Sequence, residues 1–279
     1  MVIYLDNMST IFIKILYFAA RLMVAINPRM AGHSKWKNIQ HRKGAADAKR
    51  GALFTKLAKE IMVAAKLGGG DEAANPRLRA AILKARQNSM PKENIERAIK
   101  KGTGELEGVT YEEAVYEGYG PGGIAIMVEV LTDKKSRTVP ELKSLFKSNG
   151  GTMAEANAVA YLFDRKGLIL VEGDNITEDD IMEIALEAGA EDIEKDDEKI
   201  FAVKTSVSDF HAVLAAMEPK LAAKGYKIIE SGLKYIPQTT ITVDTEKGKQ
   251  ALQLISALED YDDVQNVYTN LELTESLIA

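Results

Sequence analysis

The chain has 279 residues, 46% of them hydrophobic, and contains no cysteine. This length leaves room for two or three folded domains, and the lack of cysteine excludes disulfides, thiolate catalysis and cysteine-based metal sites. Charge is segregated: residues 30–104 hold 17 Lys+Arg against 6 Asp+Glu, whereas residues 105–279 hold 16 against 34. A basic module joined to an acidic body indicates a polyanion partner, and nucleic acid is the commonest one.

The first 29 residues are rich in apolar side chains but lack the features of a membrane span. Lys14 and Arg21 interrupt the apolar stretch 11–26, so it contains no clean run of about 18 apolar residues. We interpret residues 1–29 as an extension upstream of a functional start at Met30. A mitochondrial presequence is the alternative.

Residues 30–104 are predicted to form a three-helix bundle that follows a basic arm. Apolar residues recur at helical spacing in 52–67, and Pro76 and Pro91 stand where two further helices begin. Helices joined by short connections pack as a bundle. The arm, residues 33–50, is polar and poor in large apolar side chains.

The acidic body alternates between strands and helices, which predicts two ferredoxin-like domains. Residues 167–235 follow the order β-α-β-β-α-β, which is the ferredoxin-like order. Residues 111–163 and 239–271 together give a second such unit with one extra strand, and this assignment includes strands at 158–163 and 239–243. The predicted fold class is therefore α+β, with the third domain inserted in the second. The predicted domains are 30–104, 105–163 with 236–279, and the inserted 164–235.

The segment Gly118–Gly123 matches G-x-G-x-x-G, but its context argues against a dinucleotide site. Such a site lies between a strand and a helix, whereas strand-forming residues 124–128 follow here. We therefore predict a hairpin turn. The chain shows no nucleophile–base arrangement, no phosphate-binding loop and only three scattered histidines, so we expect no catalytic residue, no cofactor and no metal.

The candidate nucleic-acid contacts are the cations of the basic module and its single tryptophan. Lys56 and Lys59 are predicted to lie on the side of their helix opposite its apolar residues. Trp36 lies between two lysines, where it either stacks on a base or packs against the bundle. The full set is Lys35, Trp36, Lys37, Arg42, Lys43, Lys49, Arg50, Lys56, Lys59, Arg77 and Arg79.

Several long motifs resemble the YebC/PmpR family. They include Met30-Ala31-Gly32-His33-Ser34-Lys35-Trp36, Asn75-Pro76-Arg77-Leu78-Arg79 and Tyr116-Glu117-Gly118-Tyr119-Gly120-Pro121-Gly122-Gly123. Residues 134–138 and 155–159 depart from the usual family pattern. The resemblance implies a three-domain cytoplasmic protein, generally described as a probable DNA-binding transcriptional regulator. The chain is also similar to the mitochondrial translational activator of cytochrome oxidase, and some bacterial relatives are described as relieving ribosome stalling on proline-rich stretches.

Two functions therefore stay open: a DNA-binding transcriptional regulator and a ribosome- or RNA-binding translation factor. The helix connections are Gly-rich or Pro-initiated and are expected to exceed the usual helix-turn-helix turn, which weighs against the first function. No aromatic RNA-recognition strand is present, so RNA would be recognised by its shape and phosphates. An enzyme is the third and least supported possibility. We expect neither a membrane nor a small-molecule partner, and the sequence does not give the oligomeric state.

Overall fold

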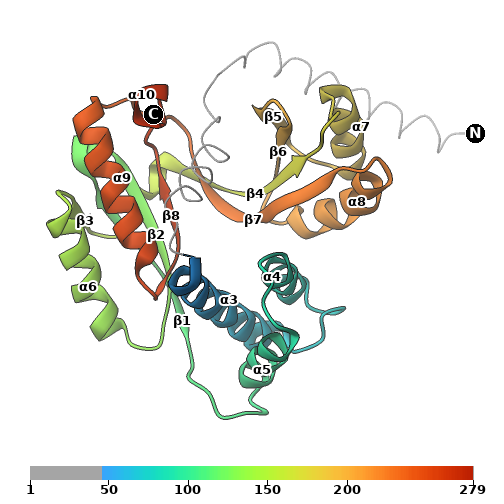
Figure 1. Cartoon of the computed structure of the whole chain (residues 1–279), viewed down its shortest axis with the longest axis horizontal. Helices are drawn as coiled ribbons and strands as arrows, with labels where there is room; N and C mark the ends of the chain where they lie inside the picture. Colours follow the sequence, from blue (N-terminus) through green and yellow to red (C-terminus); the bar gives the residue numbers. More distant parts are fainter. Residues whose placement is uncertain (1–45, 279) are drawn as a thin grey trace, which may run out of the picture.

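The computed structural model describes residues 46–278, which form a helical unit and two four-stranded sheets with their own helices (Figure 1). The helical unit consists of α3 (Ala46–Gly68), α4 (Pro76–Gln87) and α5 (Lys92–Thr103). Apolar residues at helical spacing, among them Ile61, Ile82 and Ile95, are buried in its core. The three predicted helices of the bundle are present.

Asn75 fixes the angle between α3 and α4. Its Oδ1 accepts a hydrogen bond from the Leu78 N–H at 3.1 Å, and its Nδ2 donates to the carbonyls of Ala64 and Gly69, both at 2.8 Å. The buried side chain therefore caps one helix and satisfies the end of the other. The third helix, α5, approaches α3 closely at Gly102. A Cβ at this position would lie 2.4 Å from a backbone oxygen of α3, so the close approach requires a glycine.

The first sheet, called sheet A, has the spatial order β3-β1-β2-β8, and every neighbouring pair is antiparallel. Two helices cover one of its faces and bury large apolar residues such as Phe146 against Ile126 (Figure 1). This is the ferredoxin-like spatial order reached with a permuted chain order. The strands are β1 (Glu112–Tyr119), β2 (Ala125–Thr132), β3 (Thr152–Ala154) and β8 (Val264–Thr269), and the helices are α6 (Lys135–Ser148) and α9 (Thr245–Asp260).

The second sheet, called sheet B, is formed by chain that lies between β3 and β8 in sequence. Its spatial order is β5-β6-β4-β7, entirely antiparallel, with two helices on one face, as the sequence predicts for an inserted ferredoxin-like domain. The strands are β4 (Phe163–Glu172), β5 (Asp192–Asp197), β6 (Ile200–Thr205) and β7 (Lys227–Pro237), and the helices are α7 (Glu178–Ala188) and α8 (Phe210–Ala223). A short α10 (Glu275–Ile278) follows β8.

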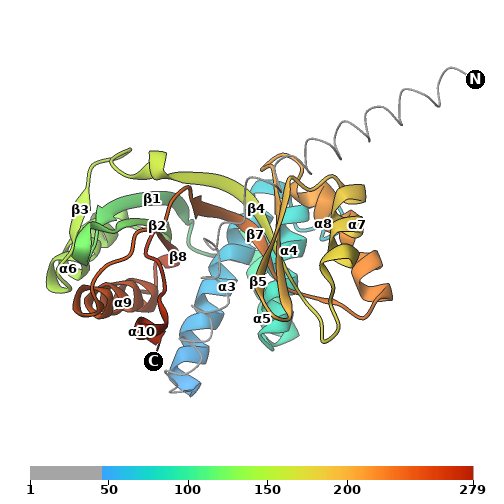
Figure 2. The ribbon, with the colours of Figure 1, turned by 90° about the horizontal axis from the view of Figure 1, so that it is seen from above.

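The strands β4 and β7 run from sheet A to sheet B, and α3 lies between the two sheet-containing units (Figure 2). Phe163 and Tyr235, near the sheet A ends of these strands, pack against Met127 and Tyr268. At the far side, Gln87 of α4 donates a hydrogen bond of 3.2 Å to the Ile228 carbonyl of β7. The helical unit therefore contacts the sheet B unit through α4.

Two predicted strands are wrong. Residues 158–162 form a bend and a short 3-10 helix, Ala160–Leu162, and only Phe163 belongs to a strand, because the buried Glu117 carboxylate accepts three hydrogen bonds from the backbone at 157–160. The donors are the N–H groups of Asn157, Val159 and Ala160, at 2.7, 2.7 and 2.9 Å. A short strand that the sequence did not predict, β3, pairs with β1 instead. Residues 239–243 contribute only a single parallel bridge, between Ile241 and Leu271.

The glycine-rich segment connects β1 to β2, so it joins two strands as predicted for a hairpin turn. Between residues 46 and 278, no helix combines the length and apolar character needed to span a membrane. In the same part of the chain, no group of three or more His, Cys, Asp or Glu side chains is placed to hold a metal ion.

We expect Glu117→Ala to destabilise the fold, because it leaves buried N–H groups without an acceptor, which costs about 1–3 kcal/mol. Urea unfolding would show this as a lower midpoint with an unchanged slope. Glu155→Ala is the matched control, since that side chain is exposed a few residues away. Equal midpoints for the two variants would contradict the role given to Glu117.

Candidate nucleic-acid interface

Lys56 and Lys59 do not form a free basic face on α3; Lys56 contacts the end of α9, and Lys59 contacts the loop between α9 and β8. The Lys59 side chain is buried, with 5% of the residue exposed. Its Nζ donates to the Asp262 carbonyl at 2.9 Å and to the Asp263 carboxylate at 2.8 Å. Lys56 donates to the Glu259 carbonyl. The acidic domain packs against the side of the helix on which these two predicted contact residues lie, so in this arrangement Lys59 is covered and Lys56 has a partner within the protein.

Asp263 is the centre of this contact. Besides Lys59, its carboxylate accepts hydrogen bonds from Arg137 at 2.9 Å, from the Thr138 hydroxyl at 2.8 Å and from the Tyr261 hydroxyl at 3.2 Å. Burial alone raises the pKa of Asp263, but the hydrogen bonds from Lys59 and Arg137 outweigh it and hold this pKa well below its usual value. The carboxylate therefore stays charged while buried between two cations.

The two predicted arginines of α4 also have partners within the protein. The Arg77 guanidinium lies between Glu60 of α3, at 2.9 Å, and Glu113 of β1. Arg79 donates to the carbonyls of Glu72, at 3.1 Å, and Ala73, at 2.6 Å, while its side chain stays exposed. Arg77 thus joins the helical unit to sheet A, whereas Arg79 remains accessible to an external anion.

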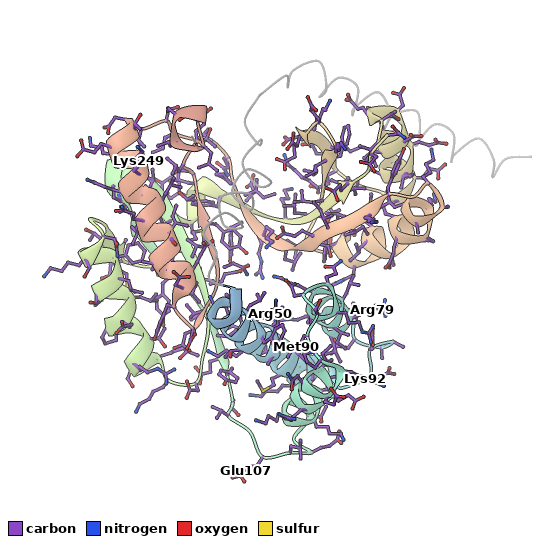
Figure 3. The ribbon with its side chains drawn as sticks, in the orientation of Figure 1. Arg50, Arg79, Met90, Lys92, Glu107 and Lys249 are labelled. Carbon is purple, nitrogen blue, oxygen red and sulfur yellow. The ribbon has the colours of Figure 1, made fainter. Side chains whose placement is uncertain are left out.

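Of the remaining predicted nucleic-acid contacts, only Arg50 has a described side chain. Arg50, near the start of α3, is exposed (Figure 3). Lys49 lies in α3, but its side chain is not among those described. The arm residues Lys35, Trp36, Lys37, Arg42 and Lys43 lie outside the described residues, so their predicted contacts stay predictions.

Three cations that the prediction missed lie on α5. Arg97, Lys100 and Lys101 are exposed, and within residues 46–278 their side chains make no hydrogen bond or ion pair. Their spacing of three and four residues places them on one side of the helix. That spacing was visible in the sequence. By contrast, Lys92 at the start of the same helix pairs with Glu96 at 3.6 Å.

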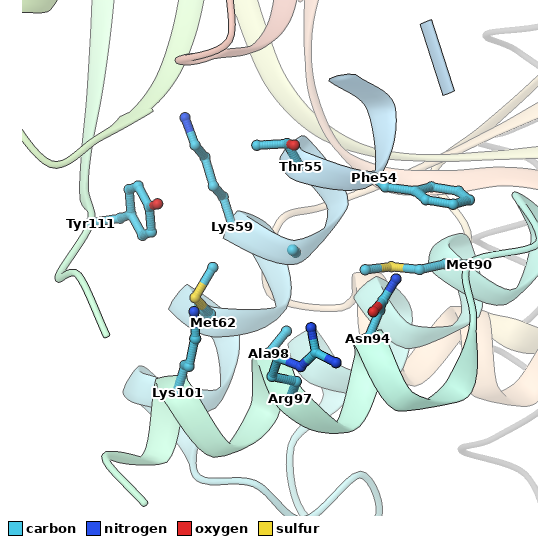
Figure 4. A pocket seen from close by; sticks show the side chains of 11 residues that line it. Phe54, Thr55, Lys59, Met62, Met90, Asn94, Arg97, Ala98, Lys101 and Tyr111 are labelled. Atoms are coloured by element: carbon cyan, nitrogen blue, oxygen red, sulfur yellow. The ribbon is translucent and has the colours of Figure 1, made fainter. Parts of the chain in front are cut away.

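A hollow of about 260 Å³ lies between α3 and α5, beside Arg97 and Lys101 (Figure 4). Met62 and Ala98 form part of its apolar lining, and Tyr111 stands at one end, with Phe54 and Met90 at the other. Arg97 and Lys101 are also lining residues. The hollow therefore combines apolar walls with cations at its rim.

The connection between α4 and α5 consists of residues 88–91, which is four residues. This is within the three to four residues of a helix-turn-helix turn, so the expectation that every connection is too long is wrong for this pair. The connection between α3 and α4, residues 69–75, is longer. If α4 and α5 dock on DNA in this way, α5 is the helix that carries the free cations.

The fold and the surface together define an α+β protein in which a basic helical unit is joined to two acidic ferredoxin-like units. The description "TACO1/YebC protein N-terminal domain" matches residues 34–105, and "TACO1/YebC second and third domain" matches residues 111–271. The chain belongs to the TACO1/YebC family. The resemblance seen in the sequence motifs is thereby confirmed.

Relatives and a solved structure agree with this membership. A "Probable transcriptional regulatory protein" of Syntrophobacter fumaroxidans is 53% identical over 89% of this chain and 98% of its own. One of the same description from Trichlorobacter lovleyi is 55% identical over 88% and 97%. The crystal structure of a conserved hypothetical protein from Aquifex aeolicus is similar, with a TM-score of 0.73 and 43% identity over 82% of this chain and 93% of that one.

We expect Lys59→Met to destabilise the protein by about 3–5 kcal/mol, because it leaves Asp263 buried with one partner fewer. Lys66→Met, on the exposed side of the same helix, is the control and should change the free energy of unfolding by less than about 0.5 kcal/mol. Denaturant unfolding measures both. Similar values for the two variants would show that the buried ion pair does not stabilise the contact.

The lowered pKa of Asp263 predicts a pH dependence. Because this pKa is lower in the folded protein than the usual value of about 4, the carboxylate stabilises the fold above about pH 4, and this contribution is lost as the pH falls further. The difference in unfolding free energy between the wild type and Asp263→Asn should therefore be largest near pH 6 and shrink below pH 4. Asp262→Asn, whose residue is exposed, serves as control. A difference that does not change with pH would contradict this role.

Proposed function

We propose that the protein is a nucleic-acid-binding regulator of gene expression, which holds the phosphate backbone with the exposed cations of its helical unit and acts by binding rather than by catalysis. The observation that carries the proposal is the cluster of Arg97, Lys100 and Lys101 on α5, together with Arg50 on α3. These cations are exposed and have no acidic partner within residues 46–278.

Several cations of the acidic units have acidic partners instead. Lys166 pairs with Glu191 at 2.7 Å, Lys199 with Asp174 at 2.8 Å, and Lys220 with Glu187. Cations without such partners are free to neutralise phosphates and to release the counterions condensed on them. The negative charge of the other two units repels a polyanion, which directs it to the helical unit.

Transcription regulation is the first candidate, because the curated relatives at 53–55% identity are named probable transcriptional regulatory proteins. The length of the α4–α5 connection is compatible with it. An RNA- or ribosome-binding translation factor is the second candidate. It is favoured by the hollow beside the cations, since an apolar slot next to positive charge suits an unpaired base more than a stacked duplex.

Replacing Arg97, Lys100 and Lys101 together with Gln should weaken binding to a polyanionic oligonucleotide and flatten its salt dependence. Each lost phosphate contact lowers the slope of log K against log salt by about 0.9 for duplex DNA, so up to about 2–3 units would be lost. Fluorescence anisotropy at several salt concentrations measures both quantities.

The matched control replaces Lys143, Lys147 and Lys249 with Gln, since these are exposed lysines of the sheet A unit (Figure 3 labels Lys249). It removes the same charge from another surface and should leave affinity and slope nearly unchanged. Equal effects of the two triple variants would show that net charge, and not the α5 surface, governs binding. Crosslinking in cells followed by sequencing of the attached nucleic acid then separates the DNA candidate from the RNA candidate.

A further inference from the structure

We propose that the hollow between α3 and α5 binds one unpaired nucleobase of a single-stranded nucleic acid, while Arg97 and Lys101 hold the adjoining phosphate. The inference rests on the proposed function and specifies the form of nucleic acid that the same surface takes. It follows from the lining, the rim, the size and the fixed wall of the hollow.

The residues that line the hollow supply apolar surfaces, which an unstacked base needs in place of its neighbouring bases. Phe54, Ala58 and Met62 contribute from α3, and Met90 and Ala98 contribute from α5 and its connection. Proteins hold unstacked bases between aromatic and apolar side chains, and methionine sulfur makes favourable contacts with aromatic rings. Met90 and Ala98 are at most 7% exposed, so the floor of the hollow belongs to the packed core of the helical unit.

Polar groups for the edge of a base are also present. Asn94 lines the hollow from α5, and its side-chain amide makes no hydrogen bond within the described part of the chain. An amide presents a donor and an acceptor side by side, which is the pattern that pairs with the edge of a base. Thr55, on the opposite helix, donates its hydroxyl proton to the Gly51 carbonyl at 3.0 Å and keeps its acceptor lone pairs.

The rim carries positive charge on one side only. Arg97 and Lys101 are exposed and without ion-pair partners among residues 46–278. Lys59 also lines the hollow, but Asp263 neutralises it at 2.8 Å. A phosphate is therefore drawn to the α5 side, where Arg97 and Lys101 lie (Figure 4). Its attached base then faces the apolar lining between the helices.

The size of the hollow restricts what can enter. About 260 Å³ is below the roughly 300–1,000 Å³ of sites for drug-sized ligands, and it suits one base rather than a stacked run. A base in a duplex stays in its stack and would have to be flipped out, which costs a few kcal/mol. The site should therefore prefer single strands and unpaired loops to duplexes.

The wall at one end of the hollow is held in place by the domain contact. Tyr111 immediately precedes β1, and the Lys59 Nζ lies 5.3 Å from the centre of its ring. Since Lys59 is fixed by Asp263, the ring is held by the packing of the helical unit against sheet A. The hollow is thus a feature of the assembled chain.

The test compares three fluorescent probes on the full chain: a mixed-sequence 12-nucleotide single strand, an abasic strand of equal length and charge, and a duplex of the same sequence. Both RNA and DNA versions of the single strand are used. We expect the base-containing strand to bind about tenfold more tightly than the abasic strand, because stacking of one base is worth a factor of this order. Equal affinities would overturn the inference.

Ala58→Leu fills the hollow without changing charge, and Ala52→Leu makes the same substitution on α3 away from the lining. We expect Ala58→Leu to lose the preference for the base-containing strand while its binding of the abasic strand and its salt slope are unchanged. Ala52→Leu should keep the preference. Retention of the preference by Ala58→Leu, at an unchanged melting temperature, would overturn the inference.

A measurement on the unaltered protein covers the case in which Ala58→Leu does not fold. With methyl-labelled methionine, the resonances of Met62 and Met90 should shift when the base-containing strand is added and stay in place with the abasic strand. Unmoved resonances at saturation would overturn the base site. Binding of all three probes with equal affinity and a steep salt slope would leave the proposed function standing without the base site, whereas binding of none would remove the proposed function itself.

Discussion

The buried ion pair between Lys59 and Asp263 determines how the rest of the molecule is arranged. Removing two charges from water is costly, and the cost is offset only where further hydrogen bonds complete both groups. Arg137 and Thr138 do this for Asp263, and the Asp262 carbonyl does it for Lys59. Lys59 comes from the helical unit, whereas the other groups come from the start of α6 and from the loop before β8. The pair therefore fixes the side of α3 that faces sheet A. The position of α5, and with it the free cations, follows from that choice.

The cations of the basic module therefore fall into two groups in the folded chain. Part of the positive charge of the helical unit is neutralised at the domain contacts, through Lys59 and through Arg77, which joins Glu60 to Glu113. The other part stays exposed on α5 and at the start of α3. A net charge counted along the sequence cannot separate these two groups, because it does not say which cations meet the acidic domains.

Local signals made most elements predictable, and long-range contacts explain the failures. Asn75 caps α4 with its own side chain and Pro76 follows it, so the sequence indicated where that helix begins. The turn at 158–162 depends on Glu117, some 40 residues away, and its short continuous apolar run resembles a strand when it is taken alone. Likewise, helical periodicity places Lys59 opposite the bundle core but does not reveal that a second domain covers that side. The cations of α5 could have been found, since their spacing of three and four residues is a local signal.

The domain contact and the hollow are linked through a single side chain. Lys59 donates to Asp263 with its ammonium group, lies over the Tyr111 ring, and lines the hollow. If the helical unit moved away from sheet A, Lys59 would lose its acceptor and Tyr111 would lose the cation that holds it, so the end wall would no longer be fixed. At the same time an uncompensated ammonium would be added beside Arg97 and Lys101, which would attract phosphate more strongly but leave the base without a preformed slot. The packed arrangement thus lowers the positive potential beside the hollow and keeps its end wall in place, which is the balance that the proposed base site requires.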